Sequence, residues 1–210
     1  MTVPSIDWHL WEARFQAFLE ASEHPGDVAH DLQHIRRVVA NARRLAEATG
    51  ADLDVIIPAA WLHDCVTVPK DSPQRSQASR LAAAAAGDFL QTSGYPARSI
   101  NAIQHAIEAH SFTARITPRT LEAQVVQDAD RLDSLGAIGI ARCLMLGGAM
   151  AKPLYDADEP LPITRTPDDR ANVIDHFFCK LLTLADTMQT SAGRAEAERR
   201  TAFMLSLIHI

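Results

Sequence analysis

Four residues of metal-binding type occur along the chain in the order His34, His63, Asp64 and Asp130. Imidazole nitrogen and carboxylate oxygen together suit a borderline or hard divalent cation, and no cysteine thiolate lies at a comparable spacing. Asp64 and Asp130 both lie in strongly apolar stretches, where an unpaired carboxylate would be costly to bury. A bound cation would remove that cost. The leading hypothesis from these residues is therefore a metal-activated water.

These four residues must be brought together by separate helices. On a helix, adjacent residues point about 100° apart, so His63 and Asp64 reach one ion only if it lies over the helix end. The segment 53–66, LDVIIPAAWLHDCV, is apolar nearly all round, which predicts a central helix that Asp52 can cap. Ligands from other helices must then complete the shell, as in known helical bundles with inward-facing ligands.

Proline, glycine and cap residues divide the rest of the chain into further helices, and no segment alternates as a strand would. The prediction is an all-α fold. Its other expected helices cover about 8–19, about 27–49 before Gly50, 72–94 from Ser72-Pro73, two more that begin at Pro96 and Thr117-Pro118, about 172–188, and one after Gly193. The stretch 146–169 is too rich in proline to be regular.

Length and charge narrow the function classes. A chain of 210 residues can bury a full core, so we expect a single domain over 1–210, with a metal-site core over about 27–145 and C-terminal loop and helices over about 146–204. The formal charge of -6 argues against nonspecific binding to nucleic acid or to an anionic membrane. No targeting signal or membrane span is evident, which favours a cytoplasmic enzyme. A homodimer is the prior expectation for its assembly.

Two smaller features complete the composition. The three cysteines, Cys65, Cys143 and Cys179, are widely spaced in apolar stretches, which indicates buried small hydrophobes and not a disulfide framework. The last residues, LSLIHI at 205–210, lose the charged face of the preceding helix, so we interpret them as a non-native tail.

Three sequence blocks carry a resemblance to a known family: HDLQHIRRV at 30–38, AAWLHDCVTVPKDSPQRSQASR at 59–80 and QDADRLDSLGAIGIAR at 127–142, with HAIEAHS at 105–111 before the last. In this order they resemble the HD superfamily of metal-dependent phosphohydrolases. The chain is similar to its small, stand-alone bacterial branch, some of whose members are nucleotide pyrophosphohydrolases. The resemblance implies an HD-domain helical bundle in which inward-facing His34, His63, Asp64 and Asp130 hold the metal.

The resemblance also bears on the number of ions. Two-metal members take further histidines from the helices after the HD pair, whereas here no histidine lies between His63 and His105, and Ser79 and Arg80 stand in the corresponding helix. We therefore expect one divalent ion. Manganese is the first choice, with Fe, Co, Ni, Zn and Mg as alternatives, because imidazole and carboxylate ligands accept all of them.

Cationic side chains near the expected site are candidates for binding phosphate. Arg37 follows His34 by one helical turn, Lys70 follows the HD helix, and Arg80 lies on the next helix. Each could stabilise charge that develops on a phosphoryl group.

The catalytic candidates are Asp64, His110 and Asp133. His110, at the end of HAIEAH, is placed to contact phosphate or the attacking water. Asp133 lies three residues after Asp130 on nearly the same helical face and could serve as general base. It could equally pair with Arg131 or Arg142, and the sequence leaves both roles open.

The prediction is a metal-dependent hydrolase of a small phosphorylated metabolite, a nucleotide in the first instance, with no nucleic-acid or membrane partner. By resemblance, the first expected activity is cleavage of a nucleoside triphosphate to monophosphate and pyrophosphate. A 5′-nucleotidase or other phosphomonoesterase would use the same residues. The alternative from another class is a catalytically idle, nucleotide-binding HD sensor. Neither a P-loop nor a G-x-S-x-G elbow is present.

Overall fold

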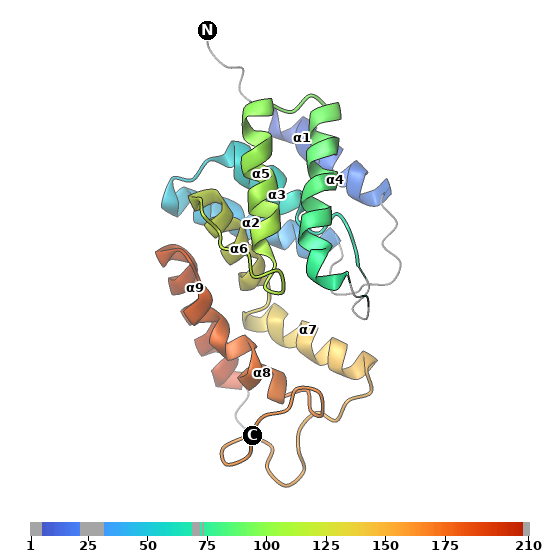
Figure 1. The fold of residues 1–210 in the computed structure, drawn as a ribbon. Helices are drawn as coiled ribbons and strands as arrows, with labels where there is room; N and C mark the ends of the chain where they lie inside the picture. The colour runs from blue at the N-terminus through green and yellow to red at the C-terminus, as the bar shows by residue number, and fades with distance from the viewer. Residues whose placement is uncertain (1–5, 22–31, 69–71, 73, 208–210) are drawn as a thin grey trace. The chain divides into compact units, whose positions relative to one another are not determined.

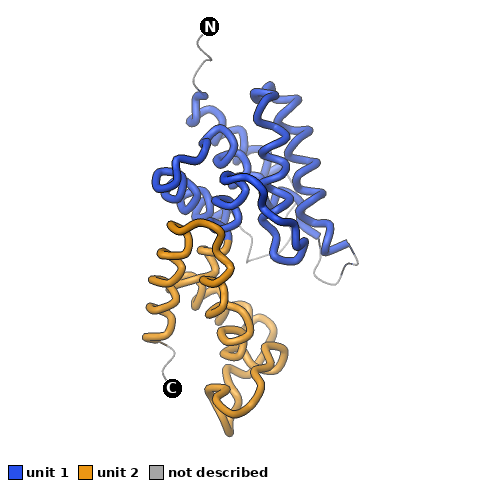
Figure 2. Tube along the Cα trace, turned by 60° about the vertical axis from the view of Figure 1, so that its left-hand side comes forward, with its two compact units in different colours: residues 1–130 blue, residues 131–210 orange. Residues whose placement is uncertain are grey.

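The computed structural model describes residues 6–21, 32–68, 72 and 74–207. Every regular element in these ranges is helical, and none of these residues forms a strand, which confirms the all-α prediction. The chain divides into two compact units, residues 1–130 and 131–210, and the division falls inside one helix (Figure 2). The prediction of a single domain stays a prediction.

Unit 1 is a bundle in which α3 packs against α2, α5 and α1, while α4 packs against α5 (Figure 1). Its helices are α1 (Trp8–Ala21), α2 (Leu32–Thr49), α3 (Leu53–Leu62), α4 (Ala78–Thr92), α5 (Ala97–His110) and the first residues of α6 (Leu121–Asp133), with a short 3-10 turn, η1 (Arg75–Gln77), ahead of α4.

The central position predicted for α3 is confirmed, because all its residues from Val55 to Leu62 are buried. Asp52 caps its start as predicted and accepts a hydrogen bond from the Asp54 backbone N–H at 2.8 Å. Pro58 lies inside this helix and has no N–H to offer the Asp54 carbonyl one turn earlier. The Tyr95 hydroxyl donates to that carbonyl instead, at 2.7 Å, so the proline leaves no unsatisfied acceptor in the core.

Aromatic side chains of α1 close one side of the bundle. Trp11 and Phe15 are buried, and the Trp11 ring lies edge-on to Tyr95 with centroids 4.8 Å apart. Trp61 of α3 donates through Nε1 to Glu12 at 3.0 Å. The aromatic stripe of the first predicted helix is therefore core.

Unit 2 contains α7 (Gly136–Ala149), α8 (Asp175–Cys179), the 3-10 helix η2 (Leu181–Thr187) and α9 (Ser191–Leu207). In this unit α9 packs against α7 and η2, and α8 packs against η2. A long irregular segment joins α7 to α8, in accordance with the proline-rich stretch in the sequence.

Several predicted boundaries were displaced. The helix expected from Ser72-Pro73 begins as η1, and the α-helix starts only at Ala78. The helix expected at Thr117-Pro118 begins at Leu121, because Thr120 is the cap: its Oγ1 accepts from the Ala123 N–H at 3.2 Å.

In unit 2 the predicted continuous helix over 172–188 was wrong. Lys180 adopts φ -141° and ψ -59°, outside the helical region, and separates α8 from η2. The last helix begins before Gly193, since Thr190 caps it by accepting from the Gly193 N–H at 2.9 Å. The prediction of three buried cysteines was also wrong, because only Cys65 is buried and Cys179 is exposed. Cys179 is the last residue of α8, and its thiol donates to the Pro167 carbonyl.

α9 continues through Leu207, so the predicted tail at 205–210 begins as helix, and 208–210 lie outside the described residues. No single described helix is long and apolar enough to span a membrane, although α6 and α7 counted together pass that test as a bent pair.

Candidate metal centre

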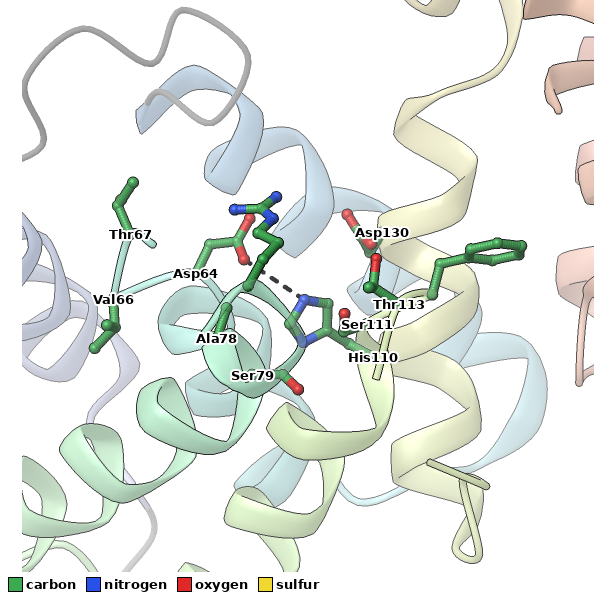
Figure 3. Close-up of a pocket in the computed structure, with 11 residues that line it drawn as sticks. Asp64, Val66, Thr67, Ala78, Ser79, His110, Ser111, Thr113 and Asp130 are labelled. Atoms are coloured by element: carbon green, nitrogen blue, oxygen red, sulfur yellow. Dashed lines mark ion pairs between the residues drawn. The ribbon is translucent and has the colours of Figure 1, made fainter. Parts of the chain in front are cut away.

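The four residues predicted as metal ligands lie together in unit 1. His34 is on α2, His63 ends α3, Asp64 follows it directly, and Asp130 is on α6. The placement over the end of α3 matches the geometric requirement that both members of the adjacent pair face one point. His110, at the C-terminal end of α5, joins them (Figure 3).

The side-chain atoms converge closely. Nε2 of His34 lies 3.4 Å from Nε2 of His63 and 3.5 Å from Oδ1 of Asp130. Oδ2 of Asp64 lies 3.6 Å from Nε2 of His63, and Oδ1 of Asp64 lies 3.5 Å from Nε2 of His110. The cluster contains two groups of three possible ligands, and within each group the ligand atoms lie within 4.8 Å of one another. His34, His63 and Asp130 form one group, and His63, Asp64 and His110 form the other.

Backbone carbonyls fix the orientation of two of the rings. Nδ1 of His63 donates to the Ala60 carbonyl at 2.8 Å, and Nδ1 of His110 donates to the Ile107 carbonyl at 2.6 Å. Because a neutral ring carries one proton, Nε2 of a neutral His63 ring presents a lone pair to the centre of the cluster. Metal-binding histidines commonly donate their other ring N–H to a backbone carbonyl in this way.

Buried amides hold the ligand-bearing helices in register. Asn41 on α2 donates to the Ala129 carbonyl at 3.1 Å, next to Asp130. Gln127 on α6 donates to the Ala109 carbonyl at 2.6 Å, next to His110. Both bonds fix α6 against its neighbours in unit 1 at the level of the cluster.

The donor set fits a divalent cation. The lone pair on Nε2 of the neutral His63 ring faces Oδ2 of Asp64 at 3.6 Å, so an acceptor meets an acceptor there. A cation among these atoms turns the mutual repulsion of acceptors into coordination. Burial, with help from the neighbouring histidines, lowers the pKa of His63 to about 4 despite the opposing effect of Asp64 and Asp130. The ring is therefore neutral near pH 7, which is the form that binds metals.

His110 has a different electrostatic setting. Burial lowers its pKa, but the hydrogen bond to Asp64 and the charges of Asp64 and Asp130 outweigh burial, so the pKa of His110 is raised above its ordinary value. The ring is 6% exposed and borders open space on one side, as described next.

A pocket of about 160 Å³ opens beside the cluster (Figure 3). One end carries Asp64, His110 and Asp130 from the cluster, and Arg75 lies on its wall. The remaining lining residues are mostly small or polar, and comprise Val66, Thr67, Ala78, Ser79, Ser111, Phe112 and Thr113.

The three cations predicted to bind phosphate differ in where the structure places them. Arg37 is half-buried on α2, one turn after His34. Arg80 is exposed and donates to Gln77 at 2.9 Å, and it is not among the residues that line the pocket. Lys70 lies outside the described residues. All three roles stay predictions.

The sequence reasoning missed Arg75, which does line the pocket. A signal was present: Arg75 precedes Ser79 by four residues, and residues four apart share a helical face. Ser79 had already been recognised as standing near the site.

Asp133 is buried in the last turn of α6, where one of its oxygens accepts from Nη1 of Arg142 at 2.7 Å. The sequence left two roles open for Asp133, as a general base or as the partner of an arginine. The ion pair with Arg142 favours the role as partner. The role of Asp133 as general base stays a prediction.

Comparison with known proteins gives a family match and similar relatives. Residues 31–135 match the HD domain family. YpgQ of Bacillus subtilis strain 168 is 35% identical over 183 residues, which are 85% of this chain and 81% of YpgQ.

Solved structures give the same result. The crystal structure of Bacillus subtilis YpgQ in complex with ADP has a TM-score of 0.72, with 33% identity and coverage of 93% of both chains. An HD-superfamily hydrolase from Bacillus thuringiensis has a TM-score of 0.69, with 32% identity and coverage of 94% of both chains.

Proposed function

The chain belongs to the HD-domain family of metal-dependent hydrolases, and from this premise we propose that it cleaves a nucleoside triphosphate to the monophosphate and pyrophosphate. The observation that carries the proposal is the pocket itself. Its metal-binding end adjoins the space that Arg75 borders, so one anionic substrate can meet both a metal and a fixed cation. The ADP bound to the related YpgQ supports a nucleotide.

In this proposal His34, His63, Asp64 and Asp130 hold one divalent ion, manganese in the first instance. When bound, such an ion polarises a phosphoryl oxygen and lowers the pKa of a water. The other steps fall to the chain's own residues.

Proton transfer is assigned to the edge of the pocket. The water oxygen forms a bond to the α-phosphorus, the bond from the α-phosphorus to the bridging oxygen breaks, and pyrophosphate leaves with that electron pair. His110, whose Nε2 lies 3.5 Å from Asp64 at the pocket wall, is placed to hold the proton that the water loses. Asp64 keeps that ring oriented.

Substrate binding is assigned to cations around the pocket. Arg37, Lys70 and Arg80 remain the cations proposed from the sequence, and each is expected to contribute through charge on the phosphate chain. Asp133 is proposed as general base only if its ion pair with Arg142 opens.

Product analysis tests the proposal. The purified protein is incubated with Mn²⁺ and a panel of nucleoside triphosphates and monophosphates in water enriched in ¹⁸O, and pyrophosphate and orthophosphate are measured separately. We expect pyrophosphate release, with ¹⁸O in the nucleoside monophosphate, because attack is at the α-phosphorus. Omission of metal with a chelator should abolish turnover.

Other outcomes would reassign the function. Label in the pyrophosphate would move the attack to the β-phosphorus. Orthophosphate released only from monophosphates would establish a phosphomonoesterase. Nucleotide binding with no product under any divalent ion would leave the nucleotide-binding sensor.

A further inference from the structure

A serine and an arginine outside the metal cluster both line the pocket. Arg75 lies in η1 and Ser79 in the first turn of α4, four residues later, and both line the pocket. Arg75 is anchored by its own chain, because its Nη1 donates to the Val68 carbonyl at 2.7 Å. The rest of this guanidinium fork is therefore held at a fixed place on the wall.

Ser79 is unusual for a buried polar residue. It is 2% exposed, and among the described residues its Oγ has no hydrogen-bond partner. A buried hydroxyl without a partner destabilises the folded state, so such groups are few in native proteins and call for an explanation. Ser79 lines a polar pocket beside the metal cluster, so a ligand there can supply the missing partner.

The charges along the pocket indicate the ligand's sign. Asp64, His110 and Asp130 line the pocket from the metal cluster, and Arg75 and Ser79 line it from η1 and α4. A serine hydroxyl and an arginine fork are both hydrogen-bond donors, which suits the oxygens of a phosphoryl group.

We propose that Ser79 and Arg75 form the subsite for the leaving pyrophosphate, with the Ser79 hydroxyl and the Arg75 guanidinium donating to its phosphoryl oxygens. This inference rests on the proposed function, since it assigns the part of the substrate that lies beside the metal. Ser79 is thus a residue that touches substrate, and its hydroxyl is satisfied only in the complex.

The size of the pocket limits what the subsite recognises. Its volume of about 160 Å³ is below the roughly 300 Å³ at which pockets for whole drug-sized ligands begin. The pocket therefore holds part of a nucleotide, and the phosphate chain is the part that matches its donors. Loss of either donor should weaken binding to the same extent whichever base the nucleotide carries.

The test uses the Mn²⁺-loaded protein and two probes, inorganic pyrophosphate and ADP, titrated by calorimetry. Ser79→Ala should weaken both probes about tenfold, the effect of one hydrogen bond to a charged group. Arg75→Gln should weaken them at least as much. Metal content, measured by elemental analysis, should equal that of the wild type in both variants.

Stability supplies a readout that a merely structural serine would not give. Because Ser79→Ala removes an unsatisfied hydroxyl, its thermal midpoint should equal or exceed that of the wild type while probe binding falls. Thr201→Val is the matched control, since Thr201 on α9 also carries a buried hydroxyl oxygen without a partner but belongs to unit 2. It should leave both affinities unchanged. Arg170→Gln, at an exposed arginine in unit 2, is the control for charge.

The outcomes separate this inference from the proposed function. If the wild type releases pyrophosphate but Ser79→Ala binds both probes within twofold of it, the subsite is wrong and the function stands. If no nucleotide is hydrolysed yet Ser79→Ala binds pyrophosphate about tenfold more weakly, the subsite stands and the function falls. A fall in thermal midpoint together with lost metal would assign Ser79 to the folded core and overturn the subsite.

Discussion

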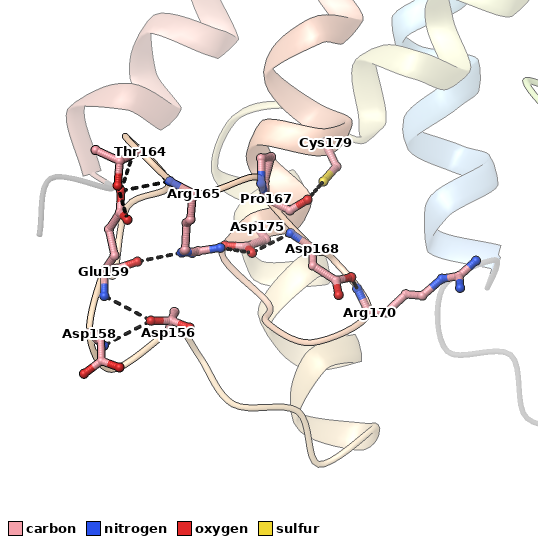
Figure 4. A network of polar contacts seen from close by, with 10 residues as sticks. All are labelled: Asp156, Asp158, Glu159, Thr164, Arg165, Pro167, Asp168, Arg170, Asp175 and Cys179. Atoms are coloured by element: carbon pink, nitrogen blue, oxygen red, sulfur yellow. Dashed lines mark hydrogen bonds and ion pairs between the residues drawn. The ribbon is translucent and has the colours of Figure 1, made fainter.

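The two units differ in the groups that surround a key carboxylate. In unit 1, Asp64 is half-exposed and lies 3.6 Å from Nε2 of His63, whose lone pair points toward the carboxylate when the ring is neutral. In unit 2, Asp175 is fully buried and meets only donors: Nη1 and Nη2 of Arg165 at 2.5 and 2.6 Å, and the Asp168 N–H at 2.7 Å (Figure 4). The first arrangement could hold a cation from outside the chain, and the second is complete without one.

The rest of the unit 2 segment reinforces that completeness. Nε of Arg165 donates to the Glu159 carbonyl at 2.9 Å, and Glu159 accepts from the Thr164 hydroxyl at 2.7 Å. The hydrogen bond from Arg165, together with the Asp168 N–H, lowers the pKa of Asp175 against the effect of burial. Buried or half-buried charge is thus a sign of function only when its neighbours cannot satisfy it.

The largest effect should follow from removing the incomplete carboxylate. Asp64→Ala takes away the group that faces both His63 and His110, so we expect metal affinity to fall by at least about 100-fold and metal-dependent turnover to vanish. The free energy of unfolding of the metal-free protein should change little, because the Asp64 side chain is 27% exposed and water can take its place beside His110. Elemental analysis, calorimetry and urea denaturation measure these quantities.

The matched control is Asp88→Ala, which removes an exposed carboxylate of α4. It should leave metal affinity and turnover unchanged. Full metal content in the Asp64→Ala variant would show that the cluster is not the metal centre.

A smaller effect of the opposite kind is expected in unit 2. Asp175→Asn keeps the shape but removes the charge that Arg165 binds, so the free energy of unfolding should fall by about 2 kcal/mol. Affinity for the metal should not change in the protein that remains folded. Urea denaturation with and without Mn²⁺ measures both, and Asp158→Asn, at an exposed position of the same segment, should stay within about 0.5 kcal/mol of wild type.

Equal stability of the Asp175→Asn and Asp158→Asn variants would remove the contrast between the units. A loss of metal affinity on Asp175→Asn would mean that the ion pair also supports the metal centre.

The central helix of the candidate metal centre was predictable from sequence because its determinants are local: the apolar run of α3, the Asp52 cap and the adjacent His63 and Asp64 are contiguous. Helical geometry adds only that other helices must supply further ligands. The choice of His34 and Asp130 came from the motif blocks that resemble the HD family, and their role as ligands stays a prediction. The all-α class followed equally from periodicity and from the absence of alternating segments.

The wall of the pocket was not predictable in the same way. Arg80 was proposed because it stands in the helix that corresponds to a ligand-bearing helix of two-metal members, whereas Arg75 lines the pocket and Arg80 is exposed. The segment that holds Arg75 is the 3-10 turn η1, with about 3.0 residues per turn instead of 3.6, and not the start of the predicted α-helix. Where a short turn ends and a helix begins depends on packing that a propensity pattern does not contain.

The long helix predicted over 172–188 failed for a related reason. Asp175 and His176, in the first turn of α8, bind Arg165 and Asp169 of the preceding segment. These contacts with the irregular segment before it anchor α8 separately, and Lys180 then leaves the helical region. The apolar stripe alone could not reveal that break.

The smallest expected effect is on the pH dependence of the free energy of unfolding, and it arises from an ion-pair cluster in unit 2. Hydrogen bonds from Arg199 at 2.8 Å and Arg200 at 2.7 Å, on α9, lower the pKa of Glu196 from 4.5 to about 2. A carboxyl whose folded pKa is lowered contributes stability above its unfolded pKa and loses it as the pH falls toward the folded value. The contribution of Glu196 should therefore disappear between about pH 4.5 and pH 2.

Glu196→Gln should flatten that part of the curve of unfolding free energy against pH, as measured by urea denaturation of the metal-free protein. The change should be modest, because the Glu196 side chain is 23% exposed and solvent screens the pair. Glu198→Gln, at an exposed glutamate of the same helix, should leave the curve as in the wild type. If both variants flatten the curve equally, the acid sensitivity reflects net charge and not the completed ion pairs of unit 2.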